Sequence, residues 1–259
     1  MSRIEQAFQK GKVFIPFITG GDPDLETTEK LIYALASAGA DIIEIGVPFS
    51  DPIAEGEVIQ AANERALRAG CTTDKLFDLI EKVHKRVSVP LVFLTYLNPV
   101  YTYGKEKFME KCKDTGIDGI IVPDLPFEEK EELEPQCQKY GIDFISLIAP
   151  TSRERIKMIA QNAKGFLYCV SSLGVTGVRK EISTDIESMI RLVRETSNIP
   201  CAVGFGISTA KQAAKYAAIA DGAIVGSAIV KIVAQYGRDS EKPVYEYVKS
   251  MKEAVKSLY

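Results

Sequence analysis

One carboxylate stands in the middle of an apolar, strand-like run near the start of the chain. The run, residues 41–47, reads DIIEIGV and places Glu44 where Val or Leu would pack better. Burying a charged carboxylate is costly unless the group is paired or raises its pKa and stays neutral. The other strand-like runs contain no Lys or Arg that would pair with it inside a sheet. We therefore interpret Glu44 as a general acid–base group, because such catalysis uses carboxyl groups whose pKa is tuned toward neutrality.

Further acids follow on the next loop, at Asp51 and Glu55. Loop acids are usually solvated, which is the default interpretation of Glu57, and Asp51 precedes Pro52 and is suited to bracing a turn. A second carboxylate on this loop would be able to oppose Glu44. The spacing does not decide between Asp51 and Glu55.

Glycines in the last quarter of the chain indicate an anion site. The segment VGFGIS (203–208) contains Gly206, and IVGSAIVKIV (224–233) places Gly226 and Ser227 at the start of a helical pattern. Helix N-termini bind phosphate through free N–H groups and the helix dipole. Each feature alone also fits a turn glycine or a capping serine.

The loop LGVTGVRKE (173–181), with Thr176 and Gly177, fits either a lid that excludes water or an ordinary surface loop.

Apolar and aromatic side chains lie toward the ends of several strand-like runs. Most such residues are simply core, but together they would suit a flat aromatic ligand. The candidates are Phe17, Leu94, Tyr96, Tyr168 and Phe205.

Short apolar runs alternate with helical patterns throughout the 259 residues. The runs cover residues 13–19, 41–47, 90–96, 118–124, 143–149, 165–171, 200–206 and 221–227. Helices are expected at 2–9, 25–39, 57–69, 74–86, 105–115, 127–140, 153–162, 184–196, 209–218, 228–236 and 242–259. Strand–helix alternation predicts right-handed crossovers and a parallel sheet, and these units match a (β/α)8 TIM barrel. An open doubly wound sheet competes, but the turn after its first strand would read GxGxxG and here reads TGGDPD.

A barrel fold predicts which way the side chain of Glu44 points. If Ile43 and Ile45 face the helices, Glu44 faces the interior, near the C-terminal strand end where barrel enzymes carry their chemistry. No composition shift marks a second domain, so residues 1–259 are expected to form one barrel domain with additional N-terminal and connecting helices.

For the helix at 25–39, Asp24 or the pair at 27–28 is a candidate N-cap, and Gly39 suits its end.

Composition narrows the function classes. The net charge of −3 argues against nucleic-acid and polybasic membrane partners, and the first residues, MSRIEQAFQKGK, contain no signal-peptide core. The five cysteines are odd in number and scattered, which fits free thiols in the cytoplasm. The one histidine, His84, lies in EKVHKR and is interpreted as a solvated helix residue. His-based metal sites and catalytic triads are therefore not expected.

Several segments together resemble the tryptophan synthase alpha subunit family. In chain order they read FIPFITGGDPD, EIGVPFSDPIAEGEVIQ, TYLNPVYTYG, IVPDLPFEE, YCVSSLGVTGVR, VGFGIS and IVGSAIVKI. The resemblance implies a (β/α)8 barrel that cleaves indole-3-glycerol phosphate to indole and glyceraldehyde 3-phosphate, as a lyase of tryptophan biosynthesis. It also implies that indole is channelled to a beta subunit dependent on pyridoxal phosphate, in an αββα tetramer. No cofactor or metal is implied for the alpha chain itself.

The same resemblance implies roles for particular residues. Glu44 takes the main proton-transfer role, Glu55 is the second catalytic carboxylate, and Tyr168 lies beside Glu44. Phe17, Leu94, Tyr96 and Phe205 surround the indole. Gly177, Gly206, Gly226 and Ser227 bind the phosphate, and Thr176 belongs to the closing loop. Contacts with the beta subunit fall around 49–56, 98–104 and 123–127.

The chain departs from the family pattern beside the second acid. The family has an aspartate in an ADGP segment, whereas this sequence reads AEGE and has Glu55 and Glu57 in place of the aspartate and the proline. The longer side chain puts the geometry of the catalytic step in question, since misplacing a catalytic group by ~1 Å costs about a hundredfold in rate.

Three alternatives remain open at this point. One is a stand-alone indole-3-glycerol-phosphate lyase. Another is a phosphosugar isomerase on the same barrel. The last is a weakened or non-catalytic subunit that mainly activates a beta-type partner.

Overall fold

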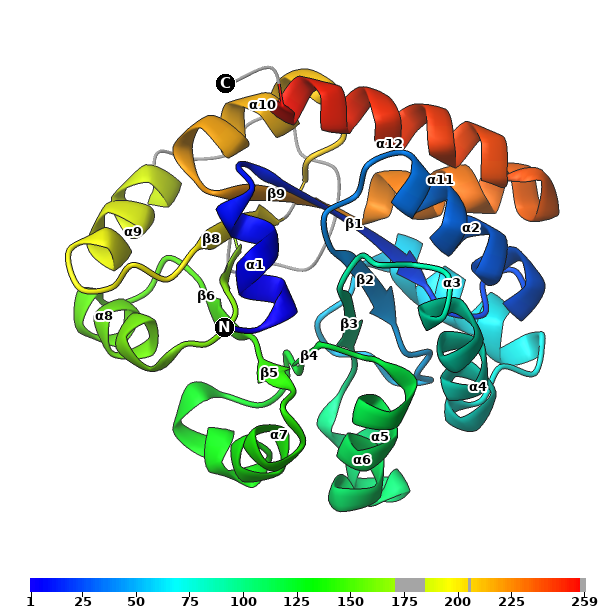
Figure 1. Ribbon diagram of the computed structural model, residues 1–259, viewed down its shortest axis with the longest axis horizontal. Coiled ribbons are helices and arrows are strands. Elements are labelled where there is room, and N and C mark those ends of the chain that lie inside the picture. The colour runs from blue at the N-terminus through cyan, green and yellow to red at the C-terminus, as the bar shows by residue number, and fades with distance from the viewer. Residues whose placement is uncertain (171–184, 205, 257–259) are drawn as a thin grey trace.

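The structure is a computed structural model that describes residues 1–170, 185–204 and 206–256. Every strand pairing in it is parallel. The order β5-β4-β3-β2-β1-β9-β8-β7-β6 curls into a nearly closed barrel ringed by helices (Figure 1). The strands are β1 (Val13–Thr19), β2 (Ile43–Gly46), β3 (Leu91–Leu94), β4 (Gly119–Ile121), β5 (Asp143–Phe144), β6 (Ser146–Ile148), β7 (Leu167–Val170), β8 (Cys201–Gly204) and β9 (Gly222–Val225). The predicted (β/α)8 barrel is confirmed.

The fifth predicted strand, 143–149, is divided in two. β5 pairs with β4 and β6 pairs with β7, and only Ile145 stands between them. The Ile145 N–H still donates to the Ile120 carbonyl at 2.9 Å. The two ends of the strand order therefore meet at one residue, where the chain changes its pairing partner and closes the barrel.

Helices follow most of the strands. They are α1 (Arg3–Gln9), α2 (Leu25–Ser37), α3 (Glu57–Arg68), α4 (Thr73–His84), α5 (Leu97–Tyr103), α6 (Lys105–Thr115), α7 (Glu134–Tyr140), α8 (Arg153–Asn162), α9 (Asp185–Arg194), α10 (Ala210–Ile219), α11 (Ser227–Tyr236) and α12 (Glu241–Lys256). Two short 3-10 helices are η1 (Phe127–Glu132) and η2 (Gly237–Asp239). Of the candidate caps for α2, Asp24 is the one used, and its side chain accepts from the Thr27 N–H at 2.8 Å.

Two helical segments differ from the sequence prediction. α5 was not among the helices expected from the sequence. Pro99 is tolerated since it lies in the first helical turn, where its missing N–H has no partner within the helix. The expected helix at 127–140 is instead η1 followed by α7, and Pro135 lies at the start of α7, where proline is favoured.

The core has two layers. Side chains between strands and helices form the outer layer, which includes Ile43 and Ile45. The barrel interior is a separate cluster, which contains Val13, Ile15, Ile42, Val92, Ile121, Ile145, Phe166, Ala202 and Ile224. Ile42, just before β2, and its neighbour Ile43 thus point to opposite sides of the sheet, and Ile43 and Ile45 face the helices, as the predicted orientation of Glu44 requires.

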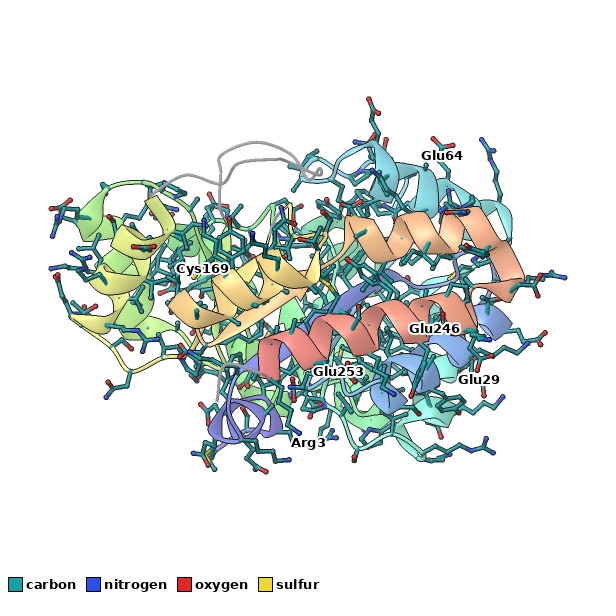
Figure 2. All side chains as sticks on the ribbon, turned by 90° about the horizontal axis from the view of Figure 1, so that it is seen from above. Arg3, Glu29, Glu64, Cys169, Glu246 and Glu253 are labelled. Carbon is teal, nitrogen blue, oxygen red and sulfur yellow. The ribbon has the colours of Figure 1, made fainter. Side chains whose placement is uncertain are left out.

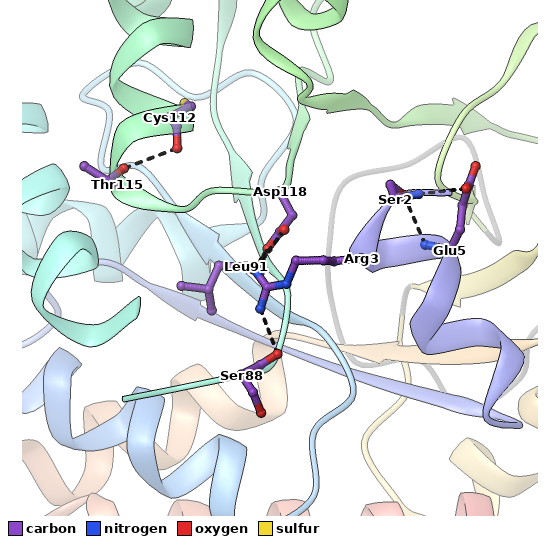
Figure 3. A network of polar contacts seen from close by, with 8 residues as sticks. All are labelled: Ser2, Arg3, Glu5, Ser88, Leu91, Cys112, Thr115 and Asp118. Atoms are coloured by element: carbon purple, nitrogen blue, oxygen red, sulfur yellow. Dashed lines mark hydrogen bonds and ion pairs between the residues drawn. The ribbon is translucent and has the colours of Figure 1, made fainter. Parts of the chain in front are cut away.

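Helix α1 covers one end of the barrel, across its centre in Figure 1. Its Ile4 is fully buried in the interior cluster. Arg3 donates to both carboxylate oxygens of Asp118 at 2.9 Å and to the Ser88 carbonyl at 2.8 Å, and Asp118 accepts from the Leu91 N–H (Figure 3). Figure 2 shows Arg3 and Glu64 of α3 on opposite sides of the molecule. Because α1 covers the opposite end of the barrel, the end next to α3 is the one available to a ligand.

Other predictions concern single residues. His84 is not a solvated residue: it is half-buried, its ring packs on the Gly116 backbone, and its Nδ1 has no hydrogen-bond partner in the described chain. The expectation of free thiols is confirmed, and all five cysteines are buried. A search of the described helices finds none that combines the length and apolarity needed to span a membrane.

Candidate active site

Glu44 lies near the C-terminal end of β2, with its side chain on the interior side of the barrel. Its register partners are Phe17 on β1 and Val92 on β3, and Val92 belongs to the interior cluster. The Glu44 residue is only 1% exposed, and its Oε2 has no hydrogen-bond partner within residues 1–170, 185–204 and 206–256. No ion pair joins it to a Lys or Arg in those ranges. A structural ion pair therefore does not explain why Glu44 is buried.

Burial changes the protonation of this group. Loss of hydration raises the pKa of Glu44 from 4.5 to about 8, and the nearby charge of Glu55 adds to the effect. A carboxyl group with this pKa holds its proton at neutral pH and still releases it within the physiological range. That behaviour is what a general acid–base group requires.

Glu55 is the second acid of the site. It is 7% exposed, and one carboxylate oxygen accepts from the Asn63 Nδ2 at 2.6 Å. A second hydrogen bond joins the Glu55 carboxylate to the Tyr96 hydroxyl. Burial raises the pKa of Glu55 to about 7, and the two hydrogen bonds oppose that rise. Asp51, by contrast, is exposed, so Glu55 is the loop acid that opposes Glu44.

Tyr168, on β7, is the third predicted catalytic residue. Burial and the adjacent Glu44 carboxylate raise the pKa of its phenol well above the usual value. Its ring occupies the space beside Gly204, where an added Cβ would come within 2.5 Å of it. Glycine at 204 therefore makes room for the tyrosine. The structure brings Glu44, Glu55 and Tyr168 together, and burial raises the pKa of each.

Phe17 and Leu94 form an apolar patch beside these acids. Phe17 packs with Ile59 and Ala62 of α3 and with Val230 of α11, and Leu94 lies against the same cluster. The Phe17 ring lies next to Gly46, where an added Cβ would come within 2.8 Å of it. An apolar wall thus adjoins the carboxyl pair.

Tyr96 takes a position that was not predicted. β3 ends at Leu94, and Tyr96 is the N-cap of α5. Its hydroxyl accepts from the Ala54 N–H at 3.2 Å and bonds to Glu55, and its ring lies 5.5 Å from that of Phe49. Tyr96 therefore contacts the acid-bearing loop, and its contact with an indole ring stays a prediction.

The candidate phosphate residues lie after β8 and β9. Gly206 has a φ of 72°, a conformation that favours glycine. Gly226, rather than the serine, is the N-cap of α11, and Ser227 is its first residue. The start of α11 thus directs backbone N–H groups toward the same barrel end as Glu44, as an anion site requires. Gly177, Thr176 and Phe205 lie outside the described residues.

Some residues of the site were not singled out from the sequence. Asn63 is buried on α3 and contacts Glu55 directly. A signal was present, because Asn63 falls between Ile59 and Ala66 on the apolar face of that helix. Arg65 forms a bidentate ion pair with the buried Asp22, at 2.7 and 2.8 Å, which fixes α3 to the loop after β1.

The departures from the family pattern are accommodated locally. Glu57 is exposed in the first turn of α3, where a negative charge interacts favourably with the helix dipole. The side chain of Gln60 donates to the Glu55 carbonyl at 2.7 Å. In the described ranges, no group of three or more His, Cys, Asp or Glu residues is arranged to hold a metal ion.

The fold and the site together define a class. A parallel (β/α)8 barrel that carries two buried, protonatable carboxyl groups at the C-terminal ends of its strands is an enzyme scaffold for acid–base chemistry on a small molecule.

Comparison with known proteins identifies a family within this class. The sequence profile of the tryptophan synthase alpha chain family matches residues 4–257. The tryptophan synthase alpha chain of Lacticaseibacillus casei is 48% identical over 255 residues, which cover 98% of this chain and 96% of that protein. This chain therefore belongs to the tryptophan synthase alpha chain family, whose members are lyases of tryptophan biosynthesis.

Solved structures agree with the sequence relationship. The crystal structure of the alpha chain from Legionella pneumophila superposes with a TM-score of 0.89 at 35% identity, covering 100% of this chain and 98% of that one. A chain of the tryptophan synthase a2b2 complex from Pyrococcus furiosus gives 0.87 at 36% identity, covering 94% and 99%. The comparisons do not favour a stand-alone lyase or a subunit that acts mainly as an activator.

Proposed function

We propose that this chain cleaves indole-3-glycerol phosphate to indole and D-glyceraldehyde 3-phosphate, as an aldol-type carbon–carbon lyase. The observation that carries the proposal is the buried Glu44, which holds a proton at neutral pH beside Glu55 in a chain of this family. Membership of the family supplies the substrate, and the carboxyl pair supplies the acid–base groups.

The reaction needs one proton to arrive and another to leave. Protonated Glu44 donates its proton to C3 of the indole ring, which makes the ring an electron sink. The glycerol hydroxyl next to C3 then loses its proton to the Glu44 carboxylate, and the bond between C3 and that carbon breaks. The bonding electrons return to the ring, indole and the aldehyde are released, and Glu44 ends the cycle protonated again. A pKa of about 8 suits both transfers.

Glu55 and Tyr168 act around this transfer. In its ionised form, Glu55 accepts a hydrogen bond from the indole N–H and stabilises the positive charge that forms on the ring after C3 is protonated. Such stabilisation is most effective inside a site that excludes water. Tyr168 stays neutral through the reaction because burial and the adjacent Glu44 raise its pKa, so it serves as an uncharged neighbour of Glu44.

The remaining candidate residues bind the two ends of the substrate. Phe17, Leu94, Tyr96 and Phe205 are proposed for the indole ring. Gly177, Gly206, Gly226 and Ser227 are proposed for the phosphate, and Thr176 for the loop that closes over the site. The position of Gly226 at the N-terminus of α11 supports the phosphate assignment.

We further propose a beta-subunit partner that contains pyridoxal phosphate and receives the indole, within an αββα tetramer. The related Pyrococcus furiosus protein is an a2b2 complex, which supports this assembly. Two of the expected contact segments expose large side chains, since Ile53 on the loop after β2 is 73% and Tyr101 on α5 46% exposed. The free cysteines fit a cytoplasmic location.

The test is an indole-release assay on the purified chain with indole-3-glycerol phosphate, alone and with a tryptophan synthase beta subunit. The proposal predicts measurable release that increases when the beta subunit is added. Absence of release under both conditions would refute the lyase, and full activity without any effect of the partner would refute the assembly.

A further inference from the structure

The two acids of the site are hydrogen-bonded very differently. The Glu55 carboxylate receives hydrogen bonds from Asn63 and from Tyr96. The Glu44 carboxyl has an oxygen with no partner anywhere in the described chain, although it is the more deeply buried of the two. Donors stabilise the charged form of a carboxylate, and burial without donors stabilises the neutral form. The two environments therefore separate the acids into an ionised and a protonated member.

We propose that Asn63 and Tyr96 are positioning residues that hold Glu55 as the ionised member of the pair, so that the proton the two acids share rests on Glu44. This inference rests on the proposed function, since it explains which acid starts the cycle with a proton. It assigns roles to Asn63, which the sequence did not single out, and to Tyr96 beyond packing against the ring.

Asn63 is held rigidly enough for this task. It is buried, and its Nδ2 lies 2.6 Å from the Glu55 Oε2. Helix α3 is fixed on the same stretch by the bidentate pair of Arg65 with Asp22. Since Gln60 donates to the Glu55 carbonyl, both the backbone and the carboxylate of Glu55 are held by α3.

Tyr96 holds the carboxylate from the opposite element, the start of α5. Its hydroxyl accepts from the Ala54 N–H, which leaves the phenolic proton for Glu55. Asp124 and Glu55 are the charges that act on Tyr96, and burial together with these charges keeps its hydroxyl protonated. A protonated hydroxyl is a donor throughout the working pH range.

The other ionisable groups around the pair do not compete for this role. β2 contributes Glu44, and β7 contributes Tyr168, which acts on the Glu44 side, and Cys169, whose side chain lies in the outer core layer. No Lys or Arg of the described residues contributes to the pKa of Glu44 or Glu55. Asn63 and Tyr96 are therefore the groups that distinguish the two carboxyls.

The test measures the titration of the glutamate carboxyls directly. Protein labelled with 13C at the glutamate carboxyls is titrated by NMR without substrate, in the wild type and in Asn63→Ala and Tyr96→Phe, with Glu55→Gln and Glu44→Gln used for assignment. Each variant removes a donor from Glu55, so its titration midpoint is expected to rise by about one pH unit or more. Tyr33→Phe is the matched control, because Tyr33 also bonds a glutamate, Glu29, but on α2.

A second measurement connects the titration with catalysis. The rise of kcat for indole release with pH is expected to move to higher pH in Asn63→Ala and Tyr96→Phe and to stay unchanged in Tyr33→Phe. Tyr96→Phe removes a single hydroxyl, which keeps the test valid if Asn63→Ala fails to fold. An unchanged Glu55 midpoint in a folded Tyr96→Phe would overturn the inference. A wild type that releases no indole would overturn the proposed function alone, since the titration does not depend on activity.

Discussion

Burial raises the pKa of Glu44 within β2, and the charge of Glu55, on the loop after β2, raises it further. A single negative charge is tolerated in this buried space, and a second one is disfavoured by repulsion. The two acids therefore titrate as a coupled pair, in which ionisation of one disfavours ionisation of the other. Both the expected chemistry and the expected pH dependence of stability depend on this relationship.

The first prediction concerns stability and pH. The pKa of Glu44 is about 8 in the folded chain and close to 4.5 when exposed, so folding takes up a proton between these values. Stability is therefore fully present at about pH 4 and decreases as the pH rises toward 8. Glu44→Gln removes this pH-dependent contribution. The free energy of unfolding of the variant is expected to exceed that of the wild type by ~3–5 kcal/mol at pH 8.5 and by much less at pH 4.

Urea unfolding at both pH values measures the effect. Glu110→Gln is the matched control, because it makes the same replacement at an exposed glutamate in the middle of α6, outside the site. Glu55 contributes a smaller slope in the same direction, which remains in Glu44→Gln. A Glu44→Gln variant with the full wild-type pH slope would show that Glu44 is ionised in the folded chain at neutral pH.

The second prediction concerns the longer acid at position 55. The Glu55 carboxylate already reaches Asn63 and Tyr96 and acts on Glu44, so the site is assembled with glutamate in place. Glu55→Asp shortens the side chain by one methylene and withdraws the carboxylate from Asn63 and Tyr96, so kcat for indole release is expected to fall by about a hundredfold, the cost of mispositioning a catalytic group by ~1 Å. A gain of two orders of magnitude over a near-zero wild type would mean that Glu55 impairs the site.

The third prediction concerns the anion site at the start of α11. Ser227→Asp places a negative charge at the N-terminus of this helix, where it is expected to stabilise the helix by ~0.3–1 kcal/mol. The same charge repels the substrate phosphate, so KM is expected to rise at least tenfold while kcat changes less. Stability and substrate binding thus change in opposite directions.

Steady-state kinetics and thermal unfolding measure both effects. Ser227→Ala is the control for loss of the hydroxyl, and it leaves the backbone N–H groups in place. An unchanged KM in Ser227→Asp would show that the phosphate binds elsewhere.

The sequence allowed the barrel and the orientation of Glu44 to be predicted because both follow from local patterns. Strand–helix alternation defines the parallel barrel, and the two-residue period of a strand turns Glu44 inward when Ile43 and Ile45 pack outward. The cap at Asp24 is equally local.

Features that depend on tertiary contacts were not predictable in the same way. Whether Asp51 or Glu55 faces Glu44 depends on how the loop folds back onto α3, where Asn63 receives one of them. The direction of Tyr96 depends on α5, which was not predicted, and Pro99 fits this helix because it falls in the first turn. The break at Ile145 follows from barrel closure and not from any local residue preference.

The most direct test of the account is the rate of indole release from indole-3-glycerol phosphate by Glu44→Gln, compared with the wild type in the presence of a beta subunit. Glutamine keeps the shape of the side chain and cannot exchange a proton, so the rate is expected to fall by at least about a hundredfold while circular dichroism shows an intact fold. A folded variant that releases indole at nearly the wild-type rate would contradict the role of Glu44 as the proton-transfer group.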